Sequence, residues 1–137
     1  MMCYTSPMLN TIALRLLTLL KEPMITFGEK LRLTSQVMPQ LDAVALVQAL
    51  RTLIEVALES HVSYNDLNAL CEASEESEML HDYLRAFFQQ DGADPRRVEM
   101  AQRLDGIIGF RMAQNKTRTQ DRRLRNTLCE YLLRAKN

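Results

Sequence analysis

The sequence predicts an all-α protein, a compact bundle of five to seven helices with a basic helical segment at its C-terminal end. Good helix formers such as Leu, Ala, Glu, Gln and Arg are abundant, whereas four Gly and four Pro leave little material for hairpin turns. Apolar residues recur at three- and four-residue spacing, as in amphipathic helices. Helix start and stop signals divide the chain into segments of helical length.

The length of 137 residues indicates one domain with its own core. We expect a flexible leader over residues 1–7 and a single helical domain over residues 8–137, in which 95–137 can form a C-terminal subdomain. The apolar stretch near the N-terminus is too short and too polar for a membrane span, and it lacks a signal-peptide pattern. Three cysteines at long spacings suggest reduced thiols in a cytoplasmic protein.

Three helices are expected in the N-terminal half. The first, over residues 8–21, is apolar on several sides, which predicts a central or doubly covered helix. Thr26 and Glu29 read as a capping box before a short helix over 27–37. Asp42 can cap the third helix, over 43–60, which carries the strongest amphipathic pattern, with Val44, Val47, Leu50, Leu53, Ile54 and Ala57 predicted to face inward.

The C-terminal half continues the helical pattern. Ser63 and Asp66 mark a helix start, and a further helix fits residues 75–89. Residues 90–94 are the clearest loop, after which Asp94 and Pro95 begin the next helix. Residues 115–119 either break this helix or lie inside one long helix, and the last helix runs to about Arg134.

Charge is segregated along the chain, although the whole is neutral with 17 basic and 17 acidic side chains. Residues 1–95 carry 6 basic and 13 acidic side chains, a sum of −7, and residues 96–137 carry 11 basic and 4 acidic, a sum of +7. Such asymmetry is typical of a binding surface or of two parts that fit each other. It points to binding rather than to catalysis.

An arginine cluster is the first candidate site. Arg118, Arg122 and Arg125 share one face of a predicted helix, Arg123 flanks them, and Arg111 joins the stripe if the helix is continuous. Guanidinium groups suit carboxylates and phosphates. The stripe is a solvated face, a docking surface for an acidic protein, or a nucleic-acid contact, and the pI of about 6.7 disfavours the last.

An acidic set forms the counterpart, with Glu75, Glu78 and Asp82 predicted on one helix face. The set is a solvated face near a helix start, or it pairs with the arginine stripe within the chain or across a dimer. The sequence leaves these alternatives open.

Other chemistry-bearing residues indicate no catalytic or metal site. His61 and His81 lack the spacing of metal ligands, Cys71 and Cys129 fall on apolar faces as buried structural thiols, and no cofactor is implied. The pair Gly106 and Gly109 is interpreted as a packing or hinge feature. Nucleotide-binding, zinc-protease and hydrolase motifs are missing.

These observations favour a non-enzymatic interaction factor, such as a regulator, adaptor or chaperone-like protein. We expect it to bind a partner protein, to form a homodimer, or both, because a small monomer cannot easily cover the apolar first helix. The alternative is a nucleic-acid-binding transcriptional regulator that uses the arginine cluster. An unfamiliar enzyme is the third possibility.

Overall fold

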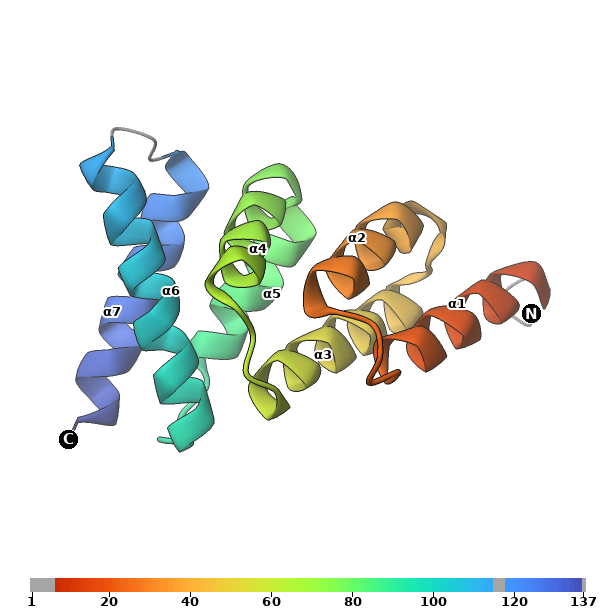
Figure 1. Ribbon diagram of the computed structural model, residues 1–137, viewed down its shortest axis with the longest axis horizontal. Coiled ribbons are helices and arrows are strands. Elements are labelled where there is room, and N and C mark those ends of the chain that lie inside the picture. The colour runs from red at the N-terminus through yellow and green to blue at the C-terminus, as the bar shows by residue number, and fades with distance from the viewer. Residues whose placement is uncertain (1–6, 115–117, 137) are drawn as a thin grey trace, which may run out of the picture. The chain divides into compact units, whose positions relative to one another are not determined.

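The computed structural model describes residues 7–114 and 118–136, and these residues form seven α-helices, a 3-10 turn and no strand. The all-α prediction is therefore confirmed (Figure 1). The elements are α1 (Pro7–Leu20), α2 (Phe27–Val37), η1 (Met38–Gln40), α3 (Ala43–Glu59), α4 (Tyr64–Glu76), α5 (Glu78–Gln89), α6 (Pro95–Ala113) and α7 (Thr119–Ala135). The predicted leader lies outside the described residues except for Pro7, which begins α1.

Short polar side chains begin the helices by accepting hydrogen bonds from otherwise unpaired backbone N–H groups. Thr26, Asp42, Ser63 and Asp94 cap α2, α3, α4 and α6, as the sequence predicts. Ser77 is a cap that the sequence interpretation missed. It ends α4 and begins α5, and its hydroxyl accepts a bond from the N–H of Leu80 at 3.2 Å. The predicted helix over 75–89 is therefore wrong at its start, because residues 75 and 76 belong to α4.

The helices group into two compact units, one ending at His61 and the other beginning at Val62. The sequence predicted a single helical domain over residues 8–137, in which residues 95–137 can form a subdomain. Residues 95–137 lie in the same unit as α4 and α5, because α6 packs on α4 and α7 packs on α5.

The first unit contains α1, α2 and α3, and each of these helices packs on the other two. Leu16, Leu20, Phe27 and Leu31 are among its buried residues. The prediction of a doubly covered first helix is wrong, because α1 buries one side and leaves Leu14 65% and Leu19 38% exposed. Two residues of α3 that were expected to face inward are also exposed, Val44 at 69% and Val47 at 46%.

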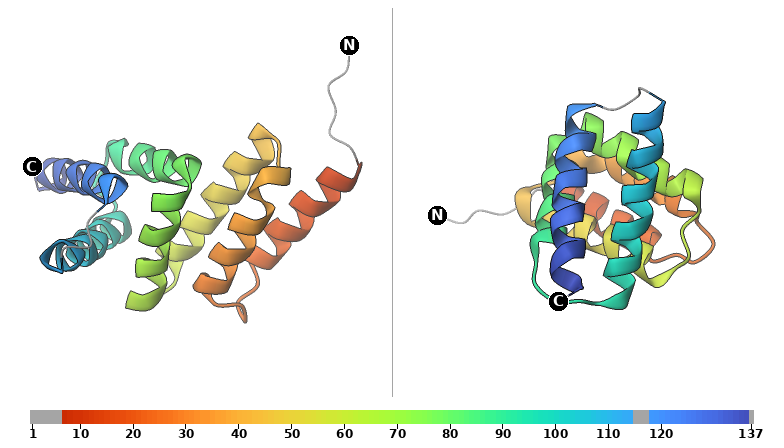
Figure 2. Two further views of the ribbon diagram at one scale, coloured as in Figure 1. Left: turned by 90° about the horizontal axis from the view of Figure 1, so that it is seen from above. Right: turned by 90° about the vertical axis from the view of Figure 1, so that its left-hand side faces the viewer.

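The second unit is a four-helix arrangement in which α4 and α7 each pack on both α5 and α6. Figure 2 shows α6 and α7 side by side along their lengths, and these two helices have the most extensive contact in the chain. Leucines and aromatic rings fill the centre, and Phe88 and Tyr131 bring their ring centroids within 5.8 Å. α6 ends at Ala113 and α7 begins at Thr119 after an extended Arg118, so the two are separate helices, and residues 115–117 of the predicted break lie outside the described residues.

The charge asymmetry of the sequence is contained in this second unit. Residues 1–61 carry 5 basic and 5 acidic side chains, so the first unit is neutral. Residues 62–94 carry 1 basic and 8 acidic side chains, and residues 95–137 carry 11 and 4. The unit therefore packs an acidic half, α4 and α5, against a basic half, α6 and α7, and is neutral as a whole.

Gly106 and Gly109 lie inside the continuous helix α6. A Cβ at Gly106 meets nothing within 4 Å, and one at Gly109 lies at an ordinary 3.6 Å from Nη2 of Arg125. Neither glycine is thus required by close packing within the described structure, and α6 has no break at either residue to act as a hinge.

Gly106→Ala is expected to raise the free energy of unfolding by about 0.5–1 kcal/mol, because alanine loses less backbone entropy in a helix than glycine. Urea denaturation measures the change. Gly92→Ala is the matched contrast and should destabilise, since Gly92 has a φ of 111° and its added Cβ would lie 3.1 Å from Arg97. An unchanged or lower stability of the Gly106 variant would contradict the expectation.

Candidate functional site

The predicted arginine stripe is not formed as a helix face. Arg118 precedes α7 with an extended backbone, so it does not share the helical phase of Arg122 and Arg125. Arg118 pairs with Glu72 at 3.5 Å, and Arg125 pairs with Asp105 of α6 at 3.0 Å. Arg122 and Arg123 are exposed. Arg123 donates a hydrogen bond to Gln120, and Arg122 has no ion-pair partner among the described residues.

The predicted acidic face is wrong as well, because Glu75 lies in α4 whereas Glu78 and Asp82 lie in α5. The Glu75 carboxylate accepts a hydrogen bond from the backbone N–H of Asp121 in the first turn of α7. Glu78 and Asp82 are exposed, and no ion pair joins them to the predicted stripe within the described residues. The predicted partner-binding residues therefore do not form two matching stripes.

Arg111 is the centre of an ionic cluster that sequence reasoning did not find. Its Nε donates to Asp121 Oδ2 at 2.9 Å, and its Nη1 bonds Glu72 and Asn68 of α4. The Arg111 side chain is 7% exposed and that of Asp121 is fully buried. Arg111 lies in the last turn of α6 and Asp121 in the first turn of α7, so both charges suit the helix dipoles. The cluster holds α4, α6 and α7 together.

Arg97 forms a second buried centre, between the end of α5 and α7. Its guanidinium donates to the carbonyl oxygens of Phe87, Asp91 and Gly92 and to the Tyr131 hydroxyl. It also lies over the Phe87 and Tyr131 rings, at 5.6 and 5.0 Å from their centroids. These contacts fix the 90–94 loop. Since the donors are used inside the chain, Arg97 serves structure and does not present an anion site.

Cys71 and Cys129 lie in different surroundings. Cys71 is buried, and burial, with the nearby Asp121 carboxylate, raises its pKa to about 12. Cys129 is exposed, so its predicted burial is wrong, and partial desolvation with the neighbouring Asp105 raises its pKa too. Raised pKa values disfavour the thiolate that nucleophilic catalysis requires.

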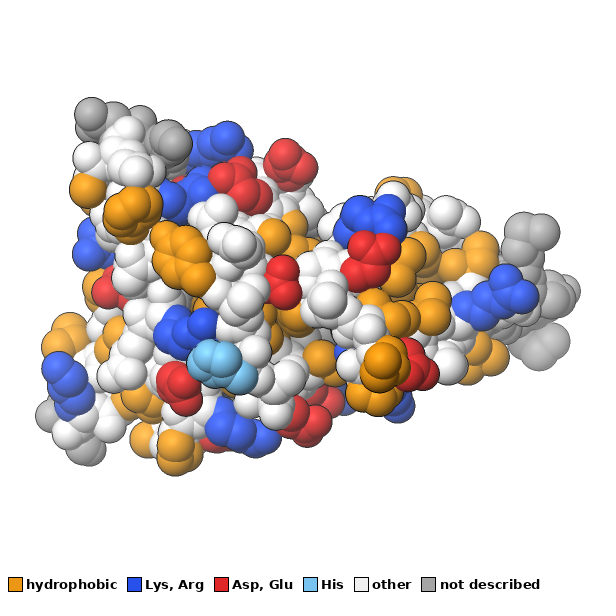
Figure 3. Space-filling view, in the orientation of Figure 1, with side chains coloured by type: hydrophobic (Ala, Val, Ile, Leu, Met, Phe, Trp, Pro, Cys, Tyr) orange, Lys and Arg blue, Asp and Glu red, His pale blue; other side chains and the backbone are white. Residues whose placement is uncertain are grey.

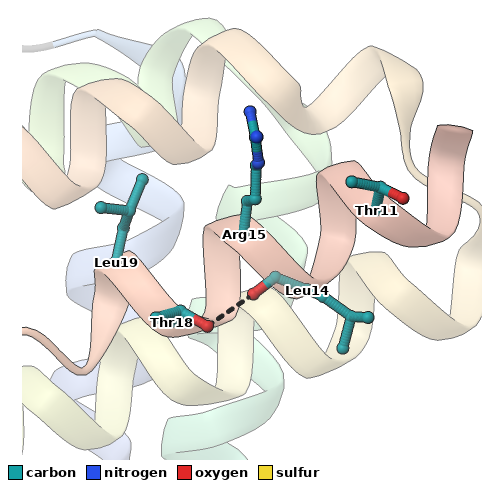
Figure 4. A pocket seen from close by; sticks show the side chains of 5 residues that line it. All are labelled: Thr11, Leu14, Arg15, Thr18 and Leu19. Carbon is teal, nitrogen blue, oxygen red and sulfur yellow. Dashed lines mark hydrogen bonds between the residues drawn. The ribbon is translucent and has the colours of Figure 1, made fainter.

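The outward face of α1 is the most apolar candidate surface. Thr11, Leu14, Arg15, Thr18 and Leu19 recur at helical spacing and line an open hollow of about 430 Å³. Figure 4 shows these five side chains, with the Thr18 hydroxyl donating to the Leu14 carbonyl oxygen at 2.9 Å. That bond satisfies the hydroxyl within the helix. Arg15 is the single charged residue in the sequence of α1.

The first unit also exposes large apolar side chains outside the outward face of α1. Val44 and Val47 of α3 are exposed, as is Met24 between α1 and α2, at 87%. Figure 3 shows hydrophobic side chains gathered at the surface over α1 and α2. Singly exposed apolar residues are ordinary, and the second unit exposes as many, so the α1 face is distinguished by the spacing of Leu14 and Leu19 along one helix face and not by their number.

Within the described residues, no group of three or more His, Cys, Asp or Glu side chains is arranged to hold a metal ion. None of the helices in that part of the chain combines the length and apolar character needed to cross a membrane. No protein-family model, curated protein or solved structure matches the chain.

Proposed function

We propose that this chain is a non-enzymatic, cytoplasmic protein-interaction factor that binds a partner protein through the outward face of α1. The observation that carries the proposal is the exposure of Leu14 and Leu19 on a helix with one charged residue. Covering these leucines would remove apolar surface from water, at about 25 cal/mol for each Å². The single Arg15 can fix the orientation of a partner that offers a carboxylate.

The arginine and acidic residues that the sequence predicted as partner-binding contribute less to this proposal. Arg118 and Arg125 are paired with carboxylates of the same unit, which lowers the positive field that a phosphate backbone would meet. Arg122 and Arg123 remain exposed and can add charge at the edge of a protein contact. The internal pairing thus favours a protein partner over a nucleic acid.

A photo-crosslinking amino acid placed at position 14 tests the proposal in the native cell. We expect one discrete protein adduct from position 14, and we expect Leu19→Ser to weaken it severalfold by shrinking the apolar face. Position 133 is the matched control, because Leu133 on α7 has the same 65% exposure as Leu14. An adduct with the chain itself would identify a homodimer, which sedimentation must then confirm.

Equal labelling from positions 14 and 133, with no discrete adduct, would show that the α1 face is not a binding surface. Fluorescence anisotropy with duplex DNA examines the alternative. We would favour the nucleic-acid regulator instead if the chain bound DNA at 50 mM salt and the logarithm of the binding constant fell with the logarithm of salt concentration at a slope near −3. The double variant Arg122→Glu with Arg123→Glu should then abolish the binding.

A further inference from the structure

His81 is a buried polar residue whose role the contacts of the second unit do not explain. It lies in the first turn of α5 with no exposed surface. Neither of its ring nitrogens has a hydrogen-bond partner among the described residues. Buried polar atoms are nearly always paired, because an unpaired one loses its hydration without compensation. The position therefore costs stability, which invites a functional explanation.

The surroundings of the ring oppose a positive charge. The charged groups that act on it are Arg123 of α7 and, on its own helix α5, Arg85, Asp82 and Glu78. Arg85 is anchored at the α5–α7 contact, where its Nε donates to the Thr127 hydroxyl at 3.1 Å. α4 also packs on α5, but none of the charged side chains described on α4 is among the groups that act on the His81 ring.

Burial, followed by the Arg123 and Arg85 guanidinium groups, lowers the pKa of His81 below its ordinary value of 6.5. The Asp82 and Glu78 carboxylates act in the opposite direction but do not offset these causes. The imidazole is therefore neutral in the folded unit at neutral pH. A proton added to it would place a third cation beside two arginines, with no acceptor for it among the described residues.

We propose that His81 is an acid-sensitive switch, in which protonation of its ring releases α5 from α7 and opens the second unit. Opening gives the ring access to water and separates it from Arg123. It also breaks the contact between Phe88 and Tyr131 and exposes apolar residues of both helices. The switch provides a second surface, regulated by pH and distinct from the α1 face.

The direction of the effect follows from proton linkage. The open form binds a proton with a pKa near 6.5, whereas the closed form excludes it. The open-to-closed ratio is therefore independent of pH well above 6.5. It rises as pH falls through that value, by at most tenfold per pH unit, until the pKa of the closed form is reached.

Hydrogen–deuterium exchange of the full chain between pH 7.5 and 5.0, corrected for intrinsic exchange rates, measures this ratio. We expect protection of α5 and α7 to fall by up to tenfold per unit below pH 6.5. The variants His81→Leu and His81→Gln cannot titrate, so their protection should stay flat over the same range. His61→Gln is the matched control, because it removes the other histidine, which is exposed.

The proposal fails if wild type and both His81 variants lose protection with the same pH dependence, because another group then causes the opening. It fails equally if the wild-type profile is flat. Glutamine keeps a polar group at the site and leucine removes it, so agreement between the two variants separates loss of titration from a packing defect.

Discussion

Arg111→Met is expected to lower the free energy of unfolding of the second unit by about 3–5 kcal/mol, since removing one partner of a buried ion pair leaves an uncompensated charge. The charge left behind is Asp121, whose side chain has no exposed surface. Its Oδ1 already has no hydrogen-bond partner among the described residues, so Oδ2 depends on the 2.9 Å bond from Arg111. Glu72 is 41% exposed and would be rehydrated instead.

Arg125→Met provides the matched control, because Arg125 joins the same two helices through Asp105 but is 36% exposed, with its partner 28% exposed. Solvent weakens such a pair, and we expect a loss of about 0–1 kcal/mol. Urea denaturation followed by tyrosine fluorescence reports on this unit, which holds three of the four Tyr in a chain without Trp.

The double variant Arg111→Met with Asp121→Leu separates the value of the ion pair from the cost of an unpaired carboxylate. It should recover most of the lost stability, because replacing a buried pair by apolar side chains is often neutral. If Arg111→Met and Arg125→Met had similar effects, burial of Asp121 would not be the controlling factor.

The fold class could be predicted from the sequence because it depends on local patterns. Apolar spacing and the capping side chains of Thr26, Asp42, Ser63 and Asp94 act within one helical turn, and the structure contains each of these helix starts. The error at Ser77 had a local cause as well. The acidic residues around it were treated as one run, although a serine is a common N-cap and an acidic residue in the first turn that follows it favours a helix start.

The ionic cluster could not be predicted, since its members are distant in sequence. Arg111 and Glu72 are 39 residues apart, and which charge is buried depends on how α4, α6 and α7 meet. The same holds for His81, whose sequence neighbours Glu78 and Asp82 suggest an exposed position. The charge asymmetry was informative in a different way, because its two halves lie in one unit and meet in the ion pairs of Glu72 with Arg111 and Arg118.

Helix faces were predicted least well in the first unit. Periodicity places Val44 and Val47 on an apolar stripe, and the apolar character of the first helix predicted that Leu19 would be covered too, but such patterns do not state how many neighbouring helices are available to cover these residues. Three helices cover less apolar surface than the sequence pattern predicted. The apolar residues of α1 that stay exposed form the surface on which the proposed function rests.

Arg97→Lys is expected to destabilise the second unit by about 2–4 kcal/mol, because charged hydrogen bonds contribute about 1.5–3 kcal/mol each and lysine cannot replace a guanidinium fork. Arg97 bonds three carbonyl oxygens and the Tyr131 hydroxyl from one planar group, at distances of 2.9–3.2 Å. An ammonium group keeps the charge but has three donors around a single nitrogen. The 90–94 loop would lose most of its attachment to α6.

Hydrogen exchange of residues 88–94 should therefore accelerate in the lysine variant, in parallel with the loss measured by urea denaturation. Arg96→Met controls for a neighbouring charge, because Arg96 and Asp94 form an exposed pair in which a loss of about 0–1 kcal/mol is expected. Wild-type stability in Arg97→Lys would mean that charge alone holds the loop. A loss in Arg97→Lys that far exceeds the loss in Arg96→Met would instead assign the effect to the geometry of the guanidinium group, which reaches the end of α5, the loop and α7 at once.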